Sequence, residues 1–153
     1  MKLHSDQVVT APPATVWSTL HDPDVLRACL PGCETFEQLP DGAVRLVLNL
    51  GVGAVRGRYE ATMRETDSRA PETYRLELNG KGAGAFIVGA AVFLLRADGP
   101  DRTRVSVDGD AQVGGPVAAI GQRMLGSVAK LLIEQFFKCI GARADAALEA
   151  ERR

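Results

Sequence analysis

The stretch that decides the fold lies near the C-terminus, where residues 116–139 read PVAAIGQRMLGSVAKLLIEQFFKC. Its apolar side chains recur at spacings of three and four residues, which is the repeat of one face of an α-helix. This face consists of Val117, Ile120, Met124, Leu125, Val128, Leu131, Leu132, Phe136 and Cys139, with Gln135 among them. Pro116 suits a first helical position, and the pattern continues to about Glu149. We therefore predict one long amphipathic helix over 116–149, on the order of 50 Å at 1.5 Å per residue.

The middle of the chain changes to a period of two, which is typical of strands. Apolar residues alternate with polar ones, as Leu76 and Leu78 do with Arg75 and Glu77. Turn-forming glycine, proline and aspartate separate the segments. The predicted strands cover residues 35–38, 44–49, 55–64, 74–79, 86–95 and 105–113. Because the strands have one apolar and one polar face, we expect an antiparallel sheet that is covered on one side only.

The N-terminal part predicts one strand and two short helices. The β-prone segment 3–10 is followed by Ala11-Pro12-Pro13, and Asp22-Pro23-Asp24 separates the two helices. The complete order indicates an α+β fold, a curved antiparallel sheet of about seven strands wrapped around the long C-terminal helix. The two short helices follow the first strand. At 153 residues, the chain is expected to form one domain over residues 1–153.

Composition excludes several function classes. Lys and Arg number 18 and Asp and Glu 19, so no net field attracts nucleic acid. The longest apolar run, Phe86 to Leu95, is far shorter than the roughly 18 residues of a membrane span. The N-terminus lacks the apolar segment of a secretory signal. We expect a cytoplasmic protein with peripheral membrane contact at most. Its 16 glycines and few aromatic residues point to a loosely filled interior.

Cysteines and histidines do not form a recognisable catalytic or metal motif. Cys29, Cys33 and Cys139 are odd in number and sparse, so we expect reduced structural thiols and no disulfide framework. Cys29 and Cys33 lack the further ligands that zinc requires. His4 and His21 belong to no triad or metal motif, and we interpret both as surface or structural groups. The sequence therefore predicts no catalytic residue and no metal site.

The segment Gly80-Lys81-Gly82-Ala83-Gly84 allows three interpretations. A phosphate-binding loop is disfavoured, because the Gly-Lys-Ser/Thr ending is missing and a strand follows. A bulge or hairpin that bends the sheet is the simplest interpretation. The third is a set of small residues that keeps the mouth of a cavity open.

Charged residues of the strands are expected on the outward face. Asp108 and Asp110 point the same way, opposite to Val105 and Val107. Paired carboxylates can act as acid and base, but on a polar face we interpret them as solubilising charges. Another strand carries Arg56, Arg58 and Arg64 outward together with Glu60. This is most simply a solvated face of mixed charge, and a partner-docking patch is the alternative.

The order of elements resembles the helix-grip fold of birch-pollen-allergen-like, START-type and polyketide cyclase-like proteins. Short motifs narrow the resemblance to the CoxG-like family of carbon monoxide dehydrogenase subunits. They are Ala11-Pro12-Pro13-Ala14-Thr15-Val16-Trp17, Asp22-Pro23-Asp24-Val25-Leu26, Cys29-Leu30-Pro31-Gly32-Cys33-Glu34, the segment 80–84, Ala111-Gln112-Val113-Gly114-Gly115 and Glu134-Gln135-Phe136-Phe137. They follow one another in the family's order over nearly the whole chain.

The resemblance implies a non-catalytic accessory protein with a hydrophobic cavity. Such proteins are encoded alongside molybdenum hydroxylases of the carbon monoxide dehydrogenase and xanthine oxidase type. Members are associated with tethering the enzyme to the inner membrane face, and the cavity suits a quinone tail. The resemblance thus implies a molybdenum hydroxylase as partner, and a membrane quinone such as menaquinone as ligand. No covalently bound cofactor is expected.

The apolar stripe of the long helix is typical both of core packing and of a cavity wall, and periodicity does not separate the two. The resemblance favours a cavity, with Met63 and Met124 adapting to the ligand and Gln135 offering a polar contact. The expected lining residues are Leu46, Leu48, Tyr59, Met63, Leu76, Leu78, Phe86, Val113, Met124, Leu125, Val128, Leu132, Gln135 and Phe136.

The sequence leaves two alternative functions open. The first is an assembly or maturation factor for the hydroxylase that acts through its surface while the interior is solid core. The second is a cyclase- or dehydratase-like enzyme, as some relatives of the fold are. We rank the enzyme last, because it needs polar groups inside and the expected inward positions are nearly all apolar.

Overall fold

The computed structural model describes residues 1–53, 55–82 and 84–153. The elements in chain order are β1 (Lys2–Val9), α1 (Pro13–Leu20), α2 (Pro23–Cys29), β2 (Cys33–Gln38), β3 (Val44–Val52), β4 (Val55–Arg69), β5 (Thr73–Gly82), β6 (Ala85–Ala97), β7 (Thr103–Gly114), the 3-10 turn η1 (Pro116–Ile120) and α3 (Gln122–Glu151).

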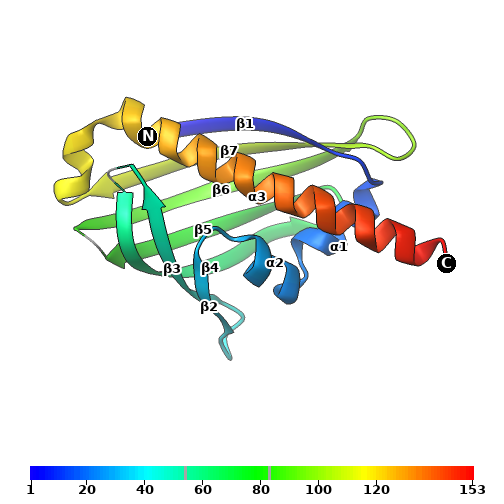
Figure 1. Ribbon diagram of the computed structural model, residues 1–153, viewed down its shortest axis with the longest axis horizontal. Coiled ribbons are helices and arrows are strands. Elements are labelled where there is room, and N and C mark those ends of the chain that lie inside the picture. The colour runs from blue at the N-terminus through cyan, green and yellow to red at the C-terminus, as the bar shows by residue number, and fades with distance from the viewer. Residues whose placement is uncertain (54, 83) are drawn as a thin grey trace.

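The strands form one antiparallel sheet in the order β1-β7-β6-β5-β4-β3-β2. From β2 to β7, strands that are consecutive in sequence are neighbours because short turns join them, whereas β1 pairs with β7 at the far edge. α3 lies across one face of this sheet, here called the inner face (Figure 1). The expected fold is confirmed: seven antiparallel strands, a long C-terminal helix, and two short helices after the first strand.

The short helices begin where proline and aspartate predict. Pro13 and Pro23 occupy the first positions of α1 and α2, where the missing N–H costs nothing. The Asp22 carboxylate accepts hydrogen bonds from the backbone N–H groups of Asp24 and Val25, at 2.9 and 3.5 Å. Asp22 therefore ends the connection from α1 and caps α2.

The long helix begins later than predicted. Pro116–Ile120 forms the separate turn η1, and α3 starts only at Gln122. Gly121 lies between them with a φ of 91°, a conformation that glycine adopts without a Cβ clash. The predicted start at Pro116 is thus wrong. A spacing of three and four residues fits a 3-10 turn followed by a helix as well as it fits one helix.

In the glycine-rich segment 80–84, Gly80, Lys81 and Gly82 are the last residues of β5, and Gly84 directly precedes β6. Lys81 pairs with Phe86 and Gly82 with Ala85, while Ala83 lies outside the described residues. β5 comes before this point and β6 after it, so the backbone does not lead into a helix N-terminus, as a phosphate-binding loop does. This confirms the hairpin interpretation of the segment.

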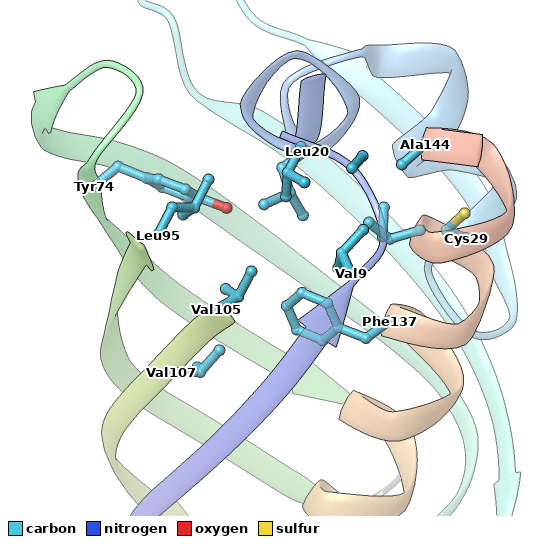
Figure 2. Close-up of a cluster of buried hydrophobic side chains, with 12 residues drawn as sticks. Val9, Leu20, Cys29, Tyr74, Leu95, Val105, Val107, Phe137 and Ala144 are labelled. Carbon is cyan, nitrogen blue, oxygen red and sulfur yellow. The ribbon is translucent and has the colours of Figure 1, made fainter. Parts of the chain in front are cut away.

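Buried side chains gather at one end of the molecule, here called the filled end (Figure 2). This cluster joins α1, β1, β5, β6, β7 and the second half of α3, and Val16, Val105 and Ile140 in it are 0% exposed. A smaller cluster joins Phe36, Leu46 and Ala61 of β2, β3 and β4. α2 packs between the two, with Val25 against the larger cluster and Leu26 against the smaller.

The cysteine expectation is wrong. Cys29 at the end of α2 and Cys139 on α3 form a disulfide, with their Cα atoms 5.4 Å apart. Cys33 is a free thiol, and burial raises its pKa. The bonded residues are 110 positions apart, so only the packing of α2 against α3 brings them together. No group of three or more potential metal-ligating side chains occurs in residues 1–53, 55–82 and 84–153.

Candidate functional site: an apolar space under the first half of α3

Most of the expected lining residues face inward from the sheet. Leu46 is 2% exposed on β3, and the alternation of that strand puts Leu48 on the same face. On β7, Val105 and Val107 are buried at the filled end, and the same alternation turns Val113 inward. The expected residues on the inner face are Leu46, Leu48, Tyr59, Met63, Leu76, Leu78 and Val113.

The helix contributes four of its expected residues to this side. Leu125 is 9% exposed, and Val128, Leu132 and Phe136 are half-buried at helical spacing from it. In contrast, Met124 is 55% exposed and Gln135 is also exposed. These two share an exposed side of α3 with Leu131, which is 41% exposed. The expectation that Met124 and Gln135 face the interior is therefore wrong.

Phe86 is the third misplaced residue. It is 54% exposed and pairs with Gly114, whereas its neighbour Ile87 pairs with the inward Val113. Successive residues of a strand point to opposite faces, so Phe86 lies on the outer face. The sequence could not decide this, because the run from Phe86 to Leu95 is apolar at every position and shows no alternation.

The two core clusters account for only part of the inner face. Leu76 and Phe136 pack against the larger cluster, and Met63 and Leu78 against the smaller one. Among the expected lining residues, a remaining set belongs to neither cluster and is only half-buried although it faces inward. These residues are Leu48, Tyr59, Val113, Val128 and Leu132. They form a half-buried apolar set on strands β3, β4 and β7 and on the first half of α3, here called the inner site.

Sequence reasoning missed the small residues that face the inner site. Gly89 pairs with Ala111, and Ala91 pairs with Gly109, on the inner face of β6 and β7. An added Cβ on Gly89 would come within 2.8 Å of the Ala111 Cβ, so larger side chains do not fit there. These residues add little volume beneath α3. The sequence shows these short side chains, but only the strand register shows that they face inward.

Three segments that reach the end of the molecule nearest the inner site contain no acidic residue, although Glu34 lies beside Arg58 there and Glu60 beside Lys81. Residues 49–59, 78–95 and 111–133 contain no Asp or Glu but carry Arg56, Arg58, Lys81, Arg123 and Lys130. The backbone brings these segments together, because the N–H of Val117 in η1 donates to the carbonyl oxygen of Gly84. Figure 1 shows the last residues of β5, the first residues of β6 and η1 at this end, here called the basic end. Since the whole chain has a net charge of −1, the acidic residues are concentrated elsewhere.

The outer face carries the paired charges that the alternation predicts. Arg58 donates to Glu34 at 2.8 and 3.0 Å, and Arg64 donates to Asp41 at 2.8 Å. The Arg64 hydrogen bond holds the pKa of Asp41 below its usual value. Such exposed pairs contribute little to stability, typically about 0–1 kcal/mol. They are consistent with a solvated face of mixed charge.

Asp108 also lies on this outer face, where it contacts a histidine. His4 lies between the carboxylates of Asp108 and Asp6, with ring nitrogens 2.6 and 3.0 Å from their oxygens. These hydrogen bonds raise the pKa of His4. A hydrogen bond from the Ser106 hydroxyl, together with the contact to His4, lowers the pKa of Asp6. His4 thus has a structural role, holding β1 to β7.

His21 is likewise structural. It stacks on Trp17 with ring centroids 4.3 Å apart, and lies edge-on to Tyr74 at 4.6 Å. Its Nδ1 lies 2.8 Å from the Trp17 carbonyl oxygen, and its Nε2 lies 2.7 Å from Glu65. This cluster joins α1 to β4 and β5 at the filled end, away from the inner site. Burial there raises the pKa of the Tyr74 hydroxyl.

A membrane-spanning helix is not found in the part of the chain that the structure describes, where no helix combines the length and hydropathy that a bilayer crossing requires.

Several solved structures share this fold. A conserved protein from Geobacillus kaustophilus is 37% identical with a TM-score of 0.93, over 96% of this chain and 97% of that one. A START superfamily protein from Mycobacterium smegmatis has a TM-score of 0.76 at 19% identity, over 95% of this chain and 98% of its own. Truncated norcoclaurine synthase from Thalictrum flavum has a TM-score of 0.65 at 16% identity, over 92% and 91%. The last two likenesses show the fold alone.

Among curated proteins, no match to the sequence was found. The family model for CoxG, which is described as a carbon monoxide dehydrogenase subunit, matches residues 6–145. That range runs from β1 into the second half of α3, so it includes the sheet, both short helices and the inner site. The chain therefore belongs to the CoxG family of carbon monoxide dehydrogenase subunits.

Proposed function

We propose that this protein is a non-catalytic accessory protein that holds a long apolar molecule in the inner site. The proposal rests on a contrast in side-chain burial between the two ends of the molecule. At the filled end Val105 and Ile140 are 0% exposed, whereas Leu48, Val113 and Val128 face inward and remain half-buried. An apolar molecule that covers such side chains gains about 25 cal/mol for each Å² of apolar surface removed from water.

The proposed ligand is a membrane quinone such as menaquinone, and the proposed partner is a molybdenum hydroxylase of the carbon monoxide dehydrogenase and xanthine oxidase type. Membership of the CoxG family supports the partner, because the family is described as a subunit of carbon monoxide dehydrogenase. The apolar inner site supports an isoprenoid tail. The protein would deliver the quinone to the enzyme or recruit the enzyme to the membrane.

The charge distribution supports loading of the ligand at a membrane surface. Each Lys or Arg near an anionic lipid surface contributes about 1 kcal/mol of attraction. Lys81, Arg123 and Lys130 lie in the acid-free segments of the basic end. Met124 and Leu131 are exposed on α3 close to Arg123 and Lys130, and they offer apolar contacts. Peripheral contact through this end would bring the inner site close to the lipid.

The test begins with protein purified from its own host. Native mass spectrometry and lipid extraction are expected to find an apolar molecule bound, and added menaquinone is expected to bind the emptied protein. Val113→Phe places a ring in the inner site and is expected to weaken menaquinone binding at least about tenfold. Gln112→Phe, on the outer face of the same strand, is the matched control. A reproducibly empty protein that ignores added menaquinone would refute the proposal.

One observation favours the second candidate, an assembly factor that acts through its surface. Val88 and Val92 on the outer face of β6 are 50% and 41% exposed. They lie in a shallow hollow of about 1060 Å³ that Asp108 and Arg75 also line. Exposed apolar side chains with a polar rim are typical of protein contact sites. Val88→Asp is expected to abolish co-purification with a hydroxylase if this surface is the contact, without changing ligand binding.

A further inference from the structure

Tyr59 places an unpaired hydroxyl group beside the inner site. It lies on the inward side of β4, opposite Leu48 of β3. Its Oη is buried and makes no hydrogen bond within residues 1–53, 55–82 and 84–153. A buried hydroxyl without a partner loses its hydrogen bonds to water and gains none in exchange. Such a group in a native protein requires an explanation.

Two other inward polar side chains have hydrogen-bond partners. The Thr103 hydroxyl donates to the Ala11 carbonyl oxygen at 2.7 Å. Gln7 donates through Nε2 to the Ser5 hydroxyl at 2.8 Å. Tyr74, on the neighbouring strand, belongs to the filled end and stacks on Phe93. Tyr59 differs from Thr103 and Gln7, because its buried hydroxyl makes no hydrogen bond to a described residue, and it differs from Tyr74 in lying beside the inner site.

We propose that Tyr59 determines ligand specificity by donating a hydrogen bond from Oη to a carbonyl oxygen of the bound molecule. This inference rests on the proposed function and deepens it, because it assigns the polar contact to one atom. The inward neighbours Leu48 and Ala61 are apolar, so a neutral acceptor fits where an ionised group would be buried without a counter-charge. The ligand class is therefore an apolar molecule with a carbonyl group, and a pure hydrocarbon or a carboxylate fits less well.

The surroundings of the ring allow it to reach a ligand. Gly57 lies two residues before Tyr59 on the inward side of β4, and Gly82 of β5 lies against its backbone. Neither adjacent glycine carries a side chain that would hold the ring in one orientation. A small rotation of the ring then moves Oη away from the atoms that enclose it and toward the carbonyl oxygen of a ligand.

The experiment compares two ligands that differ only in the carbonyl groups. The probes are 2-methyl-3-geranyl-1,4-naphthoquinone and 2-methyl-3-geranylnaphthalene, titrated into the full chain by isothermal calorimetry. The wild-type protein is expected to bind the quinone about tenfold more tightly, the value of one hydrogen bond. Tyr59→Phe is expected to lower quinone affinity to that of the naphthalene without changing naphthalene binding. Tyr74→Phe removes the same hydroxyl at the filled end and is expected to bind both probes like wild type.

Thermal unfolding adds a readout that does not depend on ligand. If Oη has no partner in the free protein, Tyr59→Phe leaves the unfolding midpoint unchanged or raises it. A clear fall in the midpoint would mean that the hydroxyl has a partner already, and would overturn the inference. Equal binding of the quinone by wild type and Tyr59→Phe would overturn it while the proposed function stands. If wild type binds neither probe, the proposed function fails and this inference fails with it.

Discussion

The disulfide between Cys29 and Cys139 joins the last residue of α2 to α3 across 110 residues of sequence. Cys29 is 5% exposed within the larger core cluster, and Cys139 packs against that cluster. α2 in turn packs between the two clusters, through Val25 on one side and Leu26 on the other. The bond therefore fixes the position of α2 relative to the second half of α3.

Removal of this disulfide is expected to lower stability. The Cys29→Ala/Cys139→Ala variant should lose about 2–4 kcal/mol of unfolding free energy, because the cross-link restricts the unfolded chain. Urea unfolding with and without dithiothreitol measures the loss. Reductant should destabilise wild type by a similar amount and leave the double variant unchanged, and Cys33→Ala serves as the control. Three alkylatable thiols in the native, unreduced protein would contradict the pairing.

Two truncations on α3 distinguish a filled interior from an open one. Ile140→Ala, at a position that is 0% exposed, is expected to cost about 2–5 kcal/mol. Leu132→Ala removes a half-buried side chain at the inner site and should cost about half as much or less. Chemical denaturation of both variants without ligand makes the comparison. Equal losses would mean that the first half of α3 covers solid core.

The contact of His4 with Asp108 predicts a pH dependence. Hydrogen bonds to Asp108 and Asp6 raise the pKa of His4 above its ordinary 6.5. With a raised pKa in the folded state, the stabilisation is complete below pH 6.5 and disappears as the pH rises through the folded-state value. An NMR titration of the His4 ring should show the raised pKa, and Asp108→Asn should lower it. Asp110→Asn, two residues along the same face, is the control and should change it less.

The basic end is expected to bind anionic vesicles. Arg123→Glu and Lys130→Glu should each weaken binding to phosphatidylglycerol-containing vesicles about fivefold or more, since each cation near such a surface contributes about 1 kcal/mol. Co-sedimentation with vesicles, compared with pure phosphatidylcholine, measures the effect. Arg152→Glu has the same charge change at the far end of α3 and should bind like wild type. Equal weakening by all three variants would show that net charge matters and the basic end does not.

Elements with a clear period were predictable. Strands β3, β4, β5 and β7 alternate apolar and polar residues, so both their existence and their inward side chains follow from the pattern. α3 follows from its apolar spacing, although its first residue does not. β6 is the exception, because its apolar run identifies a strand but not the side to which Phe86 points. Pairing of Ile87 with Val113 settles that orientation.

The inner site was predictable only in part. Leu48, Val113 and Leu132 are placed inward by periodicity, but the same periodicity placed Gln135 there, and Gln135 is exposed. The apolar stripe of a helix is wider than the surface that the helix buries, so a residue at the edge of the stripe is buried in some cases and exposed in others. The packing of α3 against β1, α1 and α2 decides which of them are covered.

The amino-acid sequence by itself determined the class of fold, because local side-chain periods of two and of three to four are set by backbone geometry. It also determined the lack of acidic residues in three separate segments. Only the tertiary structure decided that these segments meet at one end, that Cys29 bonds to Cys139, and that the Tyr59 hydroxyl is enclosed without a partner among the described residues. Each of these depends on residues far apart in the chain, whose distances are set by the packing of α2 and α3 against the sheet.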